Sequence, residues 1–219
     1  MMMRVFNKDL IYIISGGRWI FFCLLFSFII TAACPKILQL EEPANQSALK
    51  DFIEGAKQLT KRKIQYDPSY CRINYPGGDI PSDKGVCTDL VIRAFRNAGV
   101  DIQKELYEHL QSNFNLYMLN FEEGEVPDPS IDHRRVRNLM VYFRNKAIEL
   151  PVTRRSRDYL PGDIVVWKIN NKLHIGIVVD LPSKNRPNRY MIAHHSIKSG
   201  PKVQDMLFAW KMVGHYRYF

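Results

Sequence analysis

The sequence is poor in cysteine and lacks the short patterns that identify disulfide-rich or zinc-binding proteins. Only four of its 219 residues are cysteine, and two of these, Cys23 and Cys34, lie in an apolar N-terminal segment. The remaining pair, Cys71 and Cys87, is too sparse for a disulfide framework. No Cys-x-x-Cys or His-Glu-x-x-His pattern occurs, although the chain has six histidines. We therefore expect neither a metal site nor a cofactor.

The chain also lacks internal repeats, low-complexity tracts and an excess of acidic residues. Its 31 Lys and Arg outnumber its 22 Asp and Glu, which gives a net charge of +9 and favours anionic partners. The basic residues are scattered except in 61–63 and 154–157, which predict solvated surfaces, so we expect no nucleic-acid binding. With 46% hydrophobic and 24% charged residues, the composition is that of a globular protein with a sizeable core.

The N-terminus has the order of a secretory signal. Three basic residues precede an uncharged apolar run over 19–33, namely Arg4, Lys8 and Arg18. Small residues follow it up to Cys34, which completes the basic, apolar and small-residue regions of a signal. The run of about 15 residues is short for a full membrane span of about 20. Residues 1–34 are therefore predicted to be a signal peptide or an N-terminal membrane anchor, and cleavage beside Cys34 would leave a lipid anchor.

The rest of the chain divides into a tether over 35–46 and one domain over 47–219. Ser47 is expected to cap the first helix, and hydrophobic periodicity predicts helices followed by strands. The expected helices are 47–59, 87–98, 102–114 and 136–147, and the expected strands are 164–169, 172–180, 190–194 and 212–219. Asn170-Asn171 suits a tight hairpin turn. This order predicts an α+β fold with N-terminal helices packed on a C-terminal antiparallel sheet.

Cys87 stands where a loop enters an amphipathic helix that Gly99 ends. Free backbone N–H groups and the positive end of the helix dipole stabilise a thiolate at such a position, so we expect a lowered thiol pKa and a nucleophile. His174 begins a strand and is the candidate base. His194 ends the next strand and is the candidate third member of a triad, in competition with His195. Alternation sends His194 and His195 to opposite faces, so only one of them can reach His174.

The motifs Gly85-Val86-Cys87-Thr88-Asp89-Leu90 and His174-Ile175-Gly176-Ile177-Val178 are similar to those of NlpC-type papain-like cell-wall cysteine peptidases. Segments such as Tyr66-Asp67-Pro68-Ser69-Tyr70, Ile131-Asp132-His133-Arg134-Arg135 and Gly214-His215-Tyr216-Arg217-Tyr218 also resemble a bacterial family catalogued as domain of unknown function 1287. That resemblance covers about residues 50–219 and implies export and a papain-like (NlpC-type) fold. Two residues depart from the pattern that we expect: His195 where the family has asparagine, and Arg137 where it has proline.

We expect an exported cysteine amidohydrolase or peptidase that cleaves an amide bond of cell-wall peptide through Cys87, His174 and His194. It would act in the periplasm or cell envelope, tethered to the membrane by its N-terminal segment or secreted. Four further residues are candidates for substrate binding or for a structural salt-bridge cluster: Asp89, His133, Arg134 and Arg135. Two alternatives stay open, namely a papain-like lipid acyl hydrolase or acyltransferase, and a non-catalytic envelope-binding domain with a Cys71–Cys87 disulfide.

Overall fold

The computed structural model describes residues 35–186 and 188–219, with side chains from residue 45 onward. The contacts between residues divide the chain into two units, with the boundary between Pro35 and Lys36. The description that follows concerns the second unit, Lys36–Phe219. The predicted signal or anchor over 1–34 lies outside the described residues. Among the residues that are described, no helix combines the length and the apolar character needed to cross a membrane.

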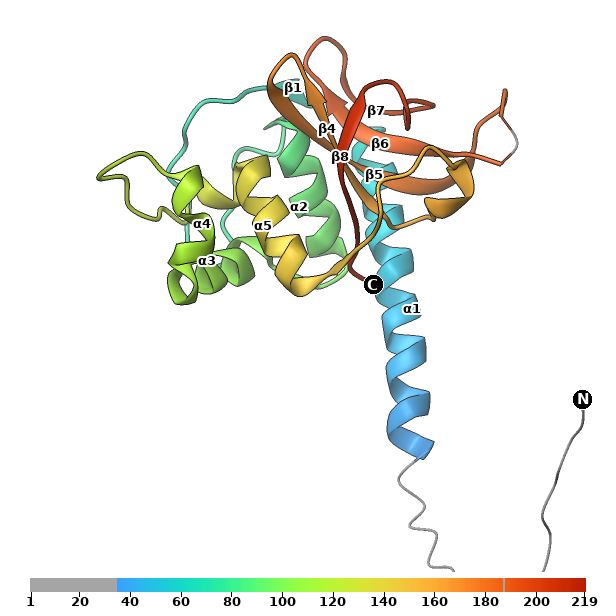
Figure 1. Cartoon of the computed structure of the whole chain (residues 1–219), viewed down its shortest axis with the longest axis horizontal. Coiled ribbons are helices and arrows are strands. Elements are labelled where there is room, and N and C mark those ends of the chain that lie inside the picture. Colours follow the sequence, from blue (N-terminus) through green and yellow to red (C-terminus); the bar gives the residue numbers. More distant parts are fainter. Residues whose placement is uncertain (1–34, 187) are drawn as a thin grey trace, which may run out of the picture. The chain divides into compact units, whose positions relative to one another are not determined.

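The helices occupy the first two thirds of this unit (Figure 1). The α-helices are α1 (Pro35–Leu59), α2 (Cys87–Asn97), α3 (Ile102–Ser112), α4 (Phe114–Tyr117) and α5 (Val136–Lys146). Three short 3₁₀ helices are η1 (Met118–Asn120), η2 (Asp132–Arg134) and η3 (Ser156–Asp158). The predictions for α2, α3 and α5 are confirmed to within a few residues. Gly99 ends the segment after α2 with a φ of +79°, a value that glycine adopts without strain.

The main sheet has six strands in the order β3-β8-β4-β5-β6-β7, and all neighbouring strands are antiparallel. Its strands are β3 (Ile148–Glu149), β4 (Ile164–Ile169), β5 (Lys172–Pro182), β6 (Tyr190–Ser196), β7 (Gly200–Gln204) and β8 (Lys211–Arg217). A separate parallel pair joins β1 (Gln65–Tyr66) to β2 (Lys84–Gly85). Asn170 and Asn171 have φ of 45° and 65°, as a hairpin turn with two left-handed residues requires. The unit is therefore α+β, as the sequence predicts.

The predicted start of the first helix at Ser47 is wrong, because α1 already begins at Pro35 and includes the segment expected to be a tether. Pro35 fits the first turn of a helix, where its missing N–H costs nothing. The intervening residues Gln39-Leu40-Glu41-Glu42 are good helix formers, which favours a helix that begins before Ser47.

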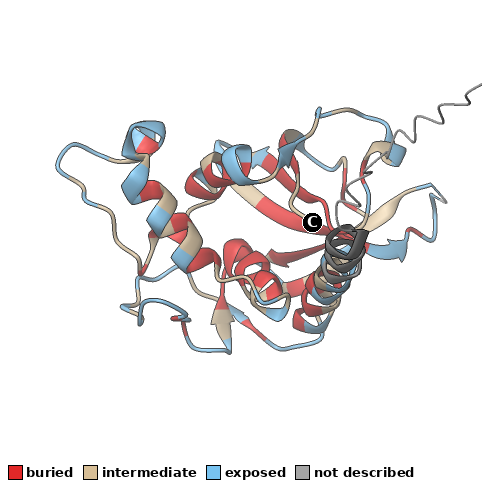
Figure 2. Ribbon diagram, turned by 90° about the horizontal axis from the view of Figure 1, so that it is seen from below, coloured by how far each residue is buried: buried red, intermediate tan, exposed pale blue. Residues whose placement is uncertain are grey.

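The helices pack on one face of the sheet, and short segments cover the other. Buried residues of α1, α2, α3 and α5 form one core with strand residues such as Val166, Ile175 and Ala193. The opposite face holds a smaller core around Trp167, whose indole N–H donates to the Leu207 carbonyl at 2.9 Å. Figure 2 shows the buried residues gathered where helices and strands face each other. This two-sided burial fixes the strands on which the histidines stand.

Candidate active site

Cys87 is the first residue of α2 and is 7% exposed. Val86 precedes it in an extended conformation, and its N–H donates to Asp89 Oδ2 at 2.7 Å. A carboxylate in the first turn that accepts an N–H from the residue before the helix is a common way to begin a helix. The sequence Val86-Cys87-Thr88-Asp89 therefore fixes the thiol at the start of α2.

The thiol lies beside the start of β5. The β5–β6 ladder pairs Ile177 with Ala193 and has no pair closer to the start of β5. The backbone N–H of Ile175 faces the Cys87 sulfur, together with the N–H groups of Cys87 and Thr88. The sulfur therefore lies next to the peptide bond that joins His174 to Ile175. The fold therefore brings the thiol close to the strand that carries His174, although the two residues are far apart in sequence.

The expected lowering of the thiol pKa is wrong in this structure. Burial raises the pKa of the Cys87 thiol to about 11, and the three N–H groups only partly oppose this shift. The Asp89 carboxylate adds a further increase. The helix position was predicted correctly, but desolvation outweighs the helix terminus because the side chain points into the protein. At neutral pH the thiol therefore holds its proton, and a base must remove it during a reaction.

His174, His194 and Gln204 form a directed chain of hydrogen bonds. His194 Nε2 lies 2.9 Å from Gln204 Oε1, and His194 Nδ1 lies 3.0 Å from His174 Nε2. The amide oxygen of Gln204 can only accept, so His194 carries its proton on Nε2 and its Nδ1 accepts from His174 Nε2. His174 Nδ1 then has a free lone pair. Among the described hydrogen bonds, the His174 ring is joined to His194 and not to the thiol.

Both histidines are held in the neutral form. Burial lowers the pKa of His174 to about 4, and the nearby His194 and His195 add to this effect. Burial also lowers the pKa of His194 and outweighs the opposing effect of its hydrogen bond to Gln204. A neutral imidazole with an unshared Nδ1 can accept a proton at neutral pH, which is the state that a general base needs.

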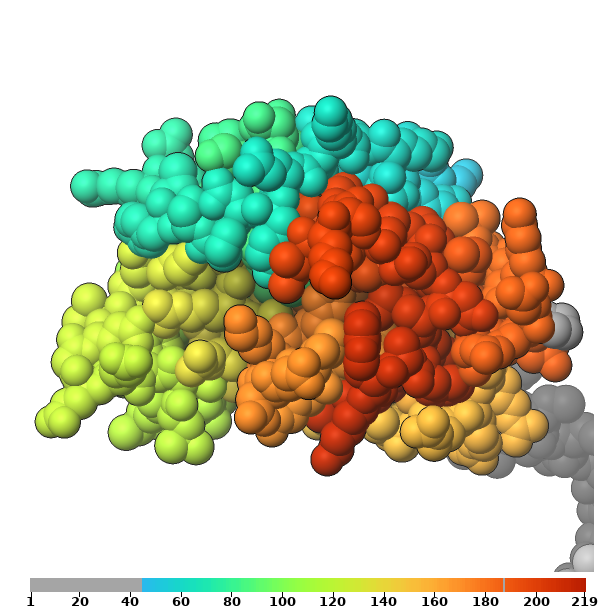
Figure 3. Space-filling model, turned by 90° about the horizontal axis from the view of Figure 1, so that it is seen from above, coloured from blue at the N-terminus to red at the C-terminus, as the bar shows by residue number. Residues whose placement is uncertain are grey.

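His194 and His195 lie on opposite faces of β6. His195 is 2% exposed, its Nε2 is 3.2 Å from the Ile64 carbonyl, and its ring meets Tyr66 edge-on at 5.5 Å. His195 therefore holds the segment after α1 against the sheet. Figure 3 shows that segment, in teal, lying against the orange-red β6–β7 region. The structure places His194, and not His195, against His174.

Gly176 makes room for the two rings. A Cβ at this position would lie 2.8 Å from Ile192 Cγ2, 3.0 Å from the Ala193 carbonyl oxygen and 3.3 Å from His194 Cβ. All three distances are shorter than ordinary contacts, and the backbone carbonyl cannot move aside cheaply. The glycine therefore allows β6 to approach β5 closely where His194 meets His174.

Of the four further candidates, Asp89 and Arg134 face each other. Arg134 Nε and Nη2 donate to the two Asp89 oxygens at 2.8 and 3.1 Å, and both side chains are buried. The pair joins the start of α2 to η2 and leaves little of either group free for a substrate. Arg135 pairs with Glu125 at 2.6 Å and lies over Phe121. His133 is buried, and burial lowers its pKa to about 3.

Sequence reasoning missed Gln204 and the aromatic rings around the base. Gln204 ends β7, a strand whose Gly-Pro start gives no strand signal. The Trp167 ring lies 5.9 Å from the His174 ring, and the Trp210 ring lies 6.0 Å from it. Trp210 is 39% exposed, so an aromatic surface adjoins the base. The pairing of Trp167 with His174 across the β4–β5 hairpin could have been found from the Asn170-Asn171 turn.

The non-catalytic alternative predicted a Cys71–Cys87 disulfide. In the structure both cysteines are free, so this disulfide is not formed. Cys71 lies in a loop and its sulfur faces the Arg72 carbonyl at 3.7 Å, whereas Cys87 is packed in the main core. Among the described residues, no group of three His, Cys, Asp or Glu side chains could hold a metal ion.

Two comparisons with known proteins give a match. The family model described as "Domain of unknown function (DUF1287)" matches residues 53–218. The chain is also 40% identical over 189 residues to "Uncharacterized protein YijF" of Escherichia coli strain K12, an alignment that covers 86% of this chain and 88% of that protein.

Proposed function

The chain belongs to the family described as domain of unknown function 1287, and within it we propose that this protein is an exported cysteine amidohydrolase with a papain-like (NlpC-type) fold. One observation carries the proposal. The relay from Gln204 through His194 to His174 leaves a free lone pair on His174 Nδ1, and the N–H of the next residue in β5, Ile175, faces the Cys87 sulfur. A buried thiol beside a neutral imidazole held by a third polar group is the arrangement of a cysteine nucleophile and its base.

In the proposed reaction, His174 Nδ1 takes the thiol proton as Cys87 Sγ attacks the carbonyl carbon of an amide. The C–N bond then breaks, the amine leaves with the proton from His174, and a thioester remains on Cys87. His174 then takes a proton from water as the water oxygen attacks the thioester carbonyl. The C–S bond breaks, and His174 returns the proton to the sulfur. The N–H of Cys87 is a candidate donor to the negatively charged oxygen, and one such donor typically lowers the barrier by about 3 kcal/mol.

The proposed substrate is an amide bond in cell-wall peptide, in the periplasm or cell envelope. The predicted N-terminal signal or anchor supports this location, and the similarity of the Cys87 and His174 motifs to cell-wall peptidases supports the substrate. A second candidate, hydrolysis or transfer of a lipid acyl group, is favoured by the exposed Trp210 ring beside the base. An aromatic surface of this kind can receive an acyl chain.

The test is incubation of the full-length protein with purified cell-wall fragments and with short-chain lipid esters, followed by mass analysis. New wall fragments that disappear with Cys87→Ala and persist with Cys71→Ala are expected, and their masses identify the bond. Turnover of the esters alone, with the same dependence on Cys87, selects the lipid candidate. Product formation that survives Cys87→Ala would rule out the proposed nucleophile.

A further inference from the structure

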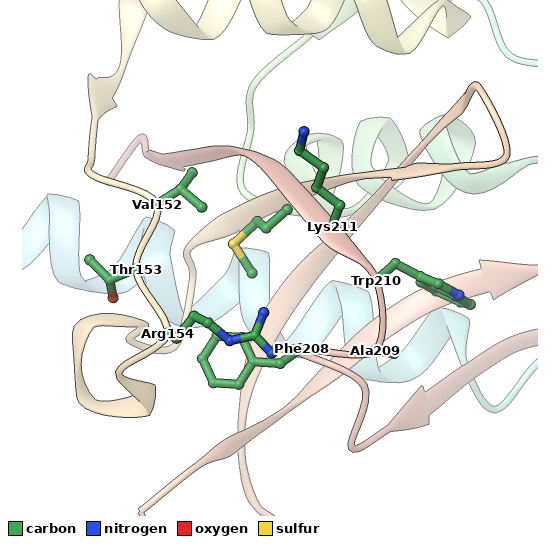
Figure 4. A pocket seen from close by; sticks show the side chains of 8 residues that line it. Val152, Thr153, Arg154, Phe208, Ala209, Trp210 and Lys211 are labelled. Atoms are coloured by element: carbon green, nitrogen blue, oxygen red, sulfur yellow. The ribbon is translucent and has the colours of Figure 1, made fainter.

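A basic hollow lies outside the site described above, where three segments far apart in sequence meet. It has a volume of about 570 Å³ and is lined by Arg154, Arg189, Asp205 and Phe208 among others. A neighbouring hollow of about 580 Å³ shares Arg189 and adds Arg155 and Arg157. Another, of about 450 Å³, shares Arg154 and Phe208 (Figure 4). The proposed reaction uses none of these arginines.

Two guanidinium groups lie near the ring of Phe208. Arg189 Cζ lies 4.7 Å and Arg154 Cζ 5.9 Å from its centroid. Figure 4 shows the Arg154 side chain lying against the Phe208 ring. A guanidinium that stacks by its face keeps the N–H groups in its plane free to donate. Arg189 is also held by its bonds to Ser156 and Asp205, so its position is fixed before any ligand arrives, which lowers the entropy lost on binding.

Only part of this positive charge is neutralised. Arg189 donates to Asp205 at 3.2 Å, and Arg155 donates to Asp158 at 2.9 Å. Arg154 and Arg157 have no carboxylate within salt-bridge distance in the part of the chain that the structure describes. A concave surface with unbalanced positive charge concentrates anions, and fixed guanidinium forks suit phosphate oxygens in particular.

We propose that the hollow between Arg154, Arg189 and Phe208 binds the phosphate group of an anionic ligand. A tetrahedral phosphate offers oxygens in several directions, which matches guanidinium groups that approach from different segments. The hollow is concave, which favours an inserted phosphate group over a flat charged surface. The group can belong to a soluble sugar phosphate or to a lipid headgroup. The site would bind this ligand whether or not Cys87 is a nucleophile.

The test is calorimetric titration of the full-length protein with inorganic pyrophosphate. Arg154→Gln should weaken binding about tenfold, because it removes a charged donor without breaking any described salt bridge. Arg62→Gln removes the same charge from an exposed position just after α1 and is the matched control, with no change expected. Cys87→Ala should also bind pyrophosphate normally, which separates this site from the proposed catalysis.

Competition against bound pyrophosphate then identifies the source of the phosphate. Displacement by glucose 1-phosphate indicates a soluble ligand, and displacement by monomeric dihexanoyl phosphatidylglycerol indicates a lipid headgroup. Arg154→Lys keeps the charge but loses the planar fork, so intermediate binding is expected. Absence of pyrophosphate binding, or equal weakening by Arg154→Gln and Arg62→Gln, would overturn the proposal, since the second result reflects net charge alone.

Discussion

Two histidine clusters in this protein use the same side chain in opposite ways. In one, His215 lies between Asp163 Oδ2 at 2.8 Å and the Pro151 carbonyl at 3.3 Å, and Tyr159 stacks on its ring at 4.2 Å. His215 and Asp163 are 1% and 0% exposed, and Arg217 donates to both Asp163 oxygens. In the other, His174 is half-buried and only its Nε2 is bonded.

The difference shows how partners decide the role of a histidine. Both nitrogens of His215 face acceptors, so neither nitrogen is available to exchange a proton with another molecule. The chain of neutral groups behind His174 instead leaves the His174 Nδ1 without a described hydrogen-bond partner. Closed hydrogen bonding indicates a structural cluster, whereas a nitrogen with an unshared lone pair can still accept a proton.

The largest expected effect is that of His174→Ala on catalysis. Removal of the base should lower the rate of wall-fragment cleavage by about 10²–10⁴-fold, because the thiol with a raised pKa then has no group to accept its proton. Product formation measured by mass analysis, with thermal unfolding as a check of the fold, gives the answer. A variant that retains a tenth of the activity would contradict the role of His174.

Asp163→Ala should act on stability instead. It leaves His215 and Arg217 without their carboxylate in a buried place, which typically costs about 3–5 kcal/mol of unfolding free energy. Urea unfolding measures this loss. The control is Asp180→Ala, which breaks an exposed pair with Lys57 and should cost about 0–1 kcal/mol. Similar losses of unfolding free energy in the two variants would contradict the structural role of the buried His215 cluster.

Gln204→Ala should lower the cleavage rate about tenfold while leaving the unfolding midpoint nearly unchanged. Without the amide oxygen, His194 is free to carry its proton on Nδ1, and the relay no longer leaves His174 Nδ1 as the acceptor. Gln58→Ala, on the exposed side of α1, is the control. A rate unaffected by Gln204→Ala would show that His194 needs no orientation.

The smallest effect is a shift in the pH profile. The pKa of His174 is lowered to about 4, so its neutral, active form is already dominant above that pH. Activity should therefore rise near pH 4 and stay level through neutral pH, whereas a histidine with an ordinary pKa would give a rise near 6.5. Values of kcat/KM, obtained from initial rates between pH 3.5 and 8, distinguish a pKa near 4 from one near 6.5.

Local patterns predicted much of the fold and the contact between His174 and His194. The start of α2 at Cys87, the hairpin at Asn170-Asn171 and the opposite directions of His194 and His195 follow from short-range rules. The raised pKa of Cys87 could not be predicted, because it depends on how deeply β5 covers the sulfur. Gln204 was missed for a related reason, since only the pairing of β6 with β7 brings it to His194.

The position of β8 has a consequence for how the chain is made. β8 follows β4–β7 in the sequence, yet it lies between β3 and β4, and among the described residues β3 pairs with β8 alone. During synthesis, the edge of β4 that pairs with β8 therefore stays open until residues 211–217 have been made. An open edge invites pairing with other chains, so a holding chaperone should raise the yield of folded protein.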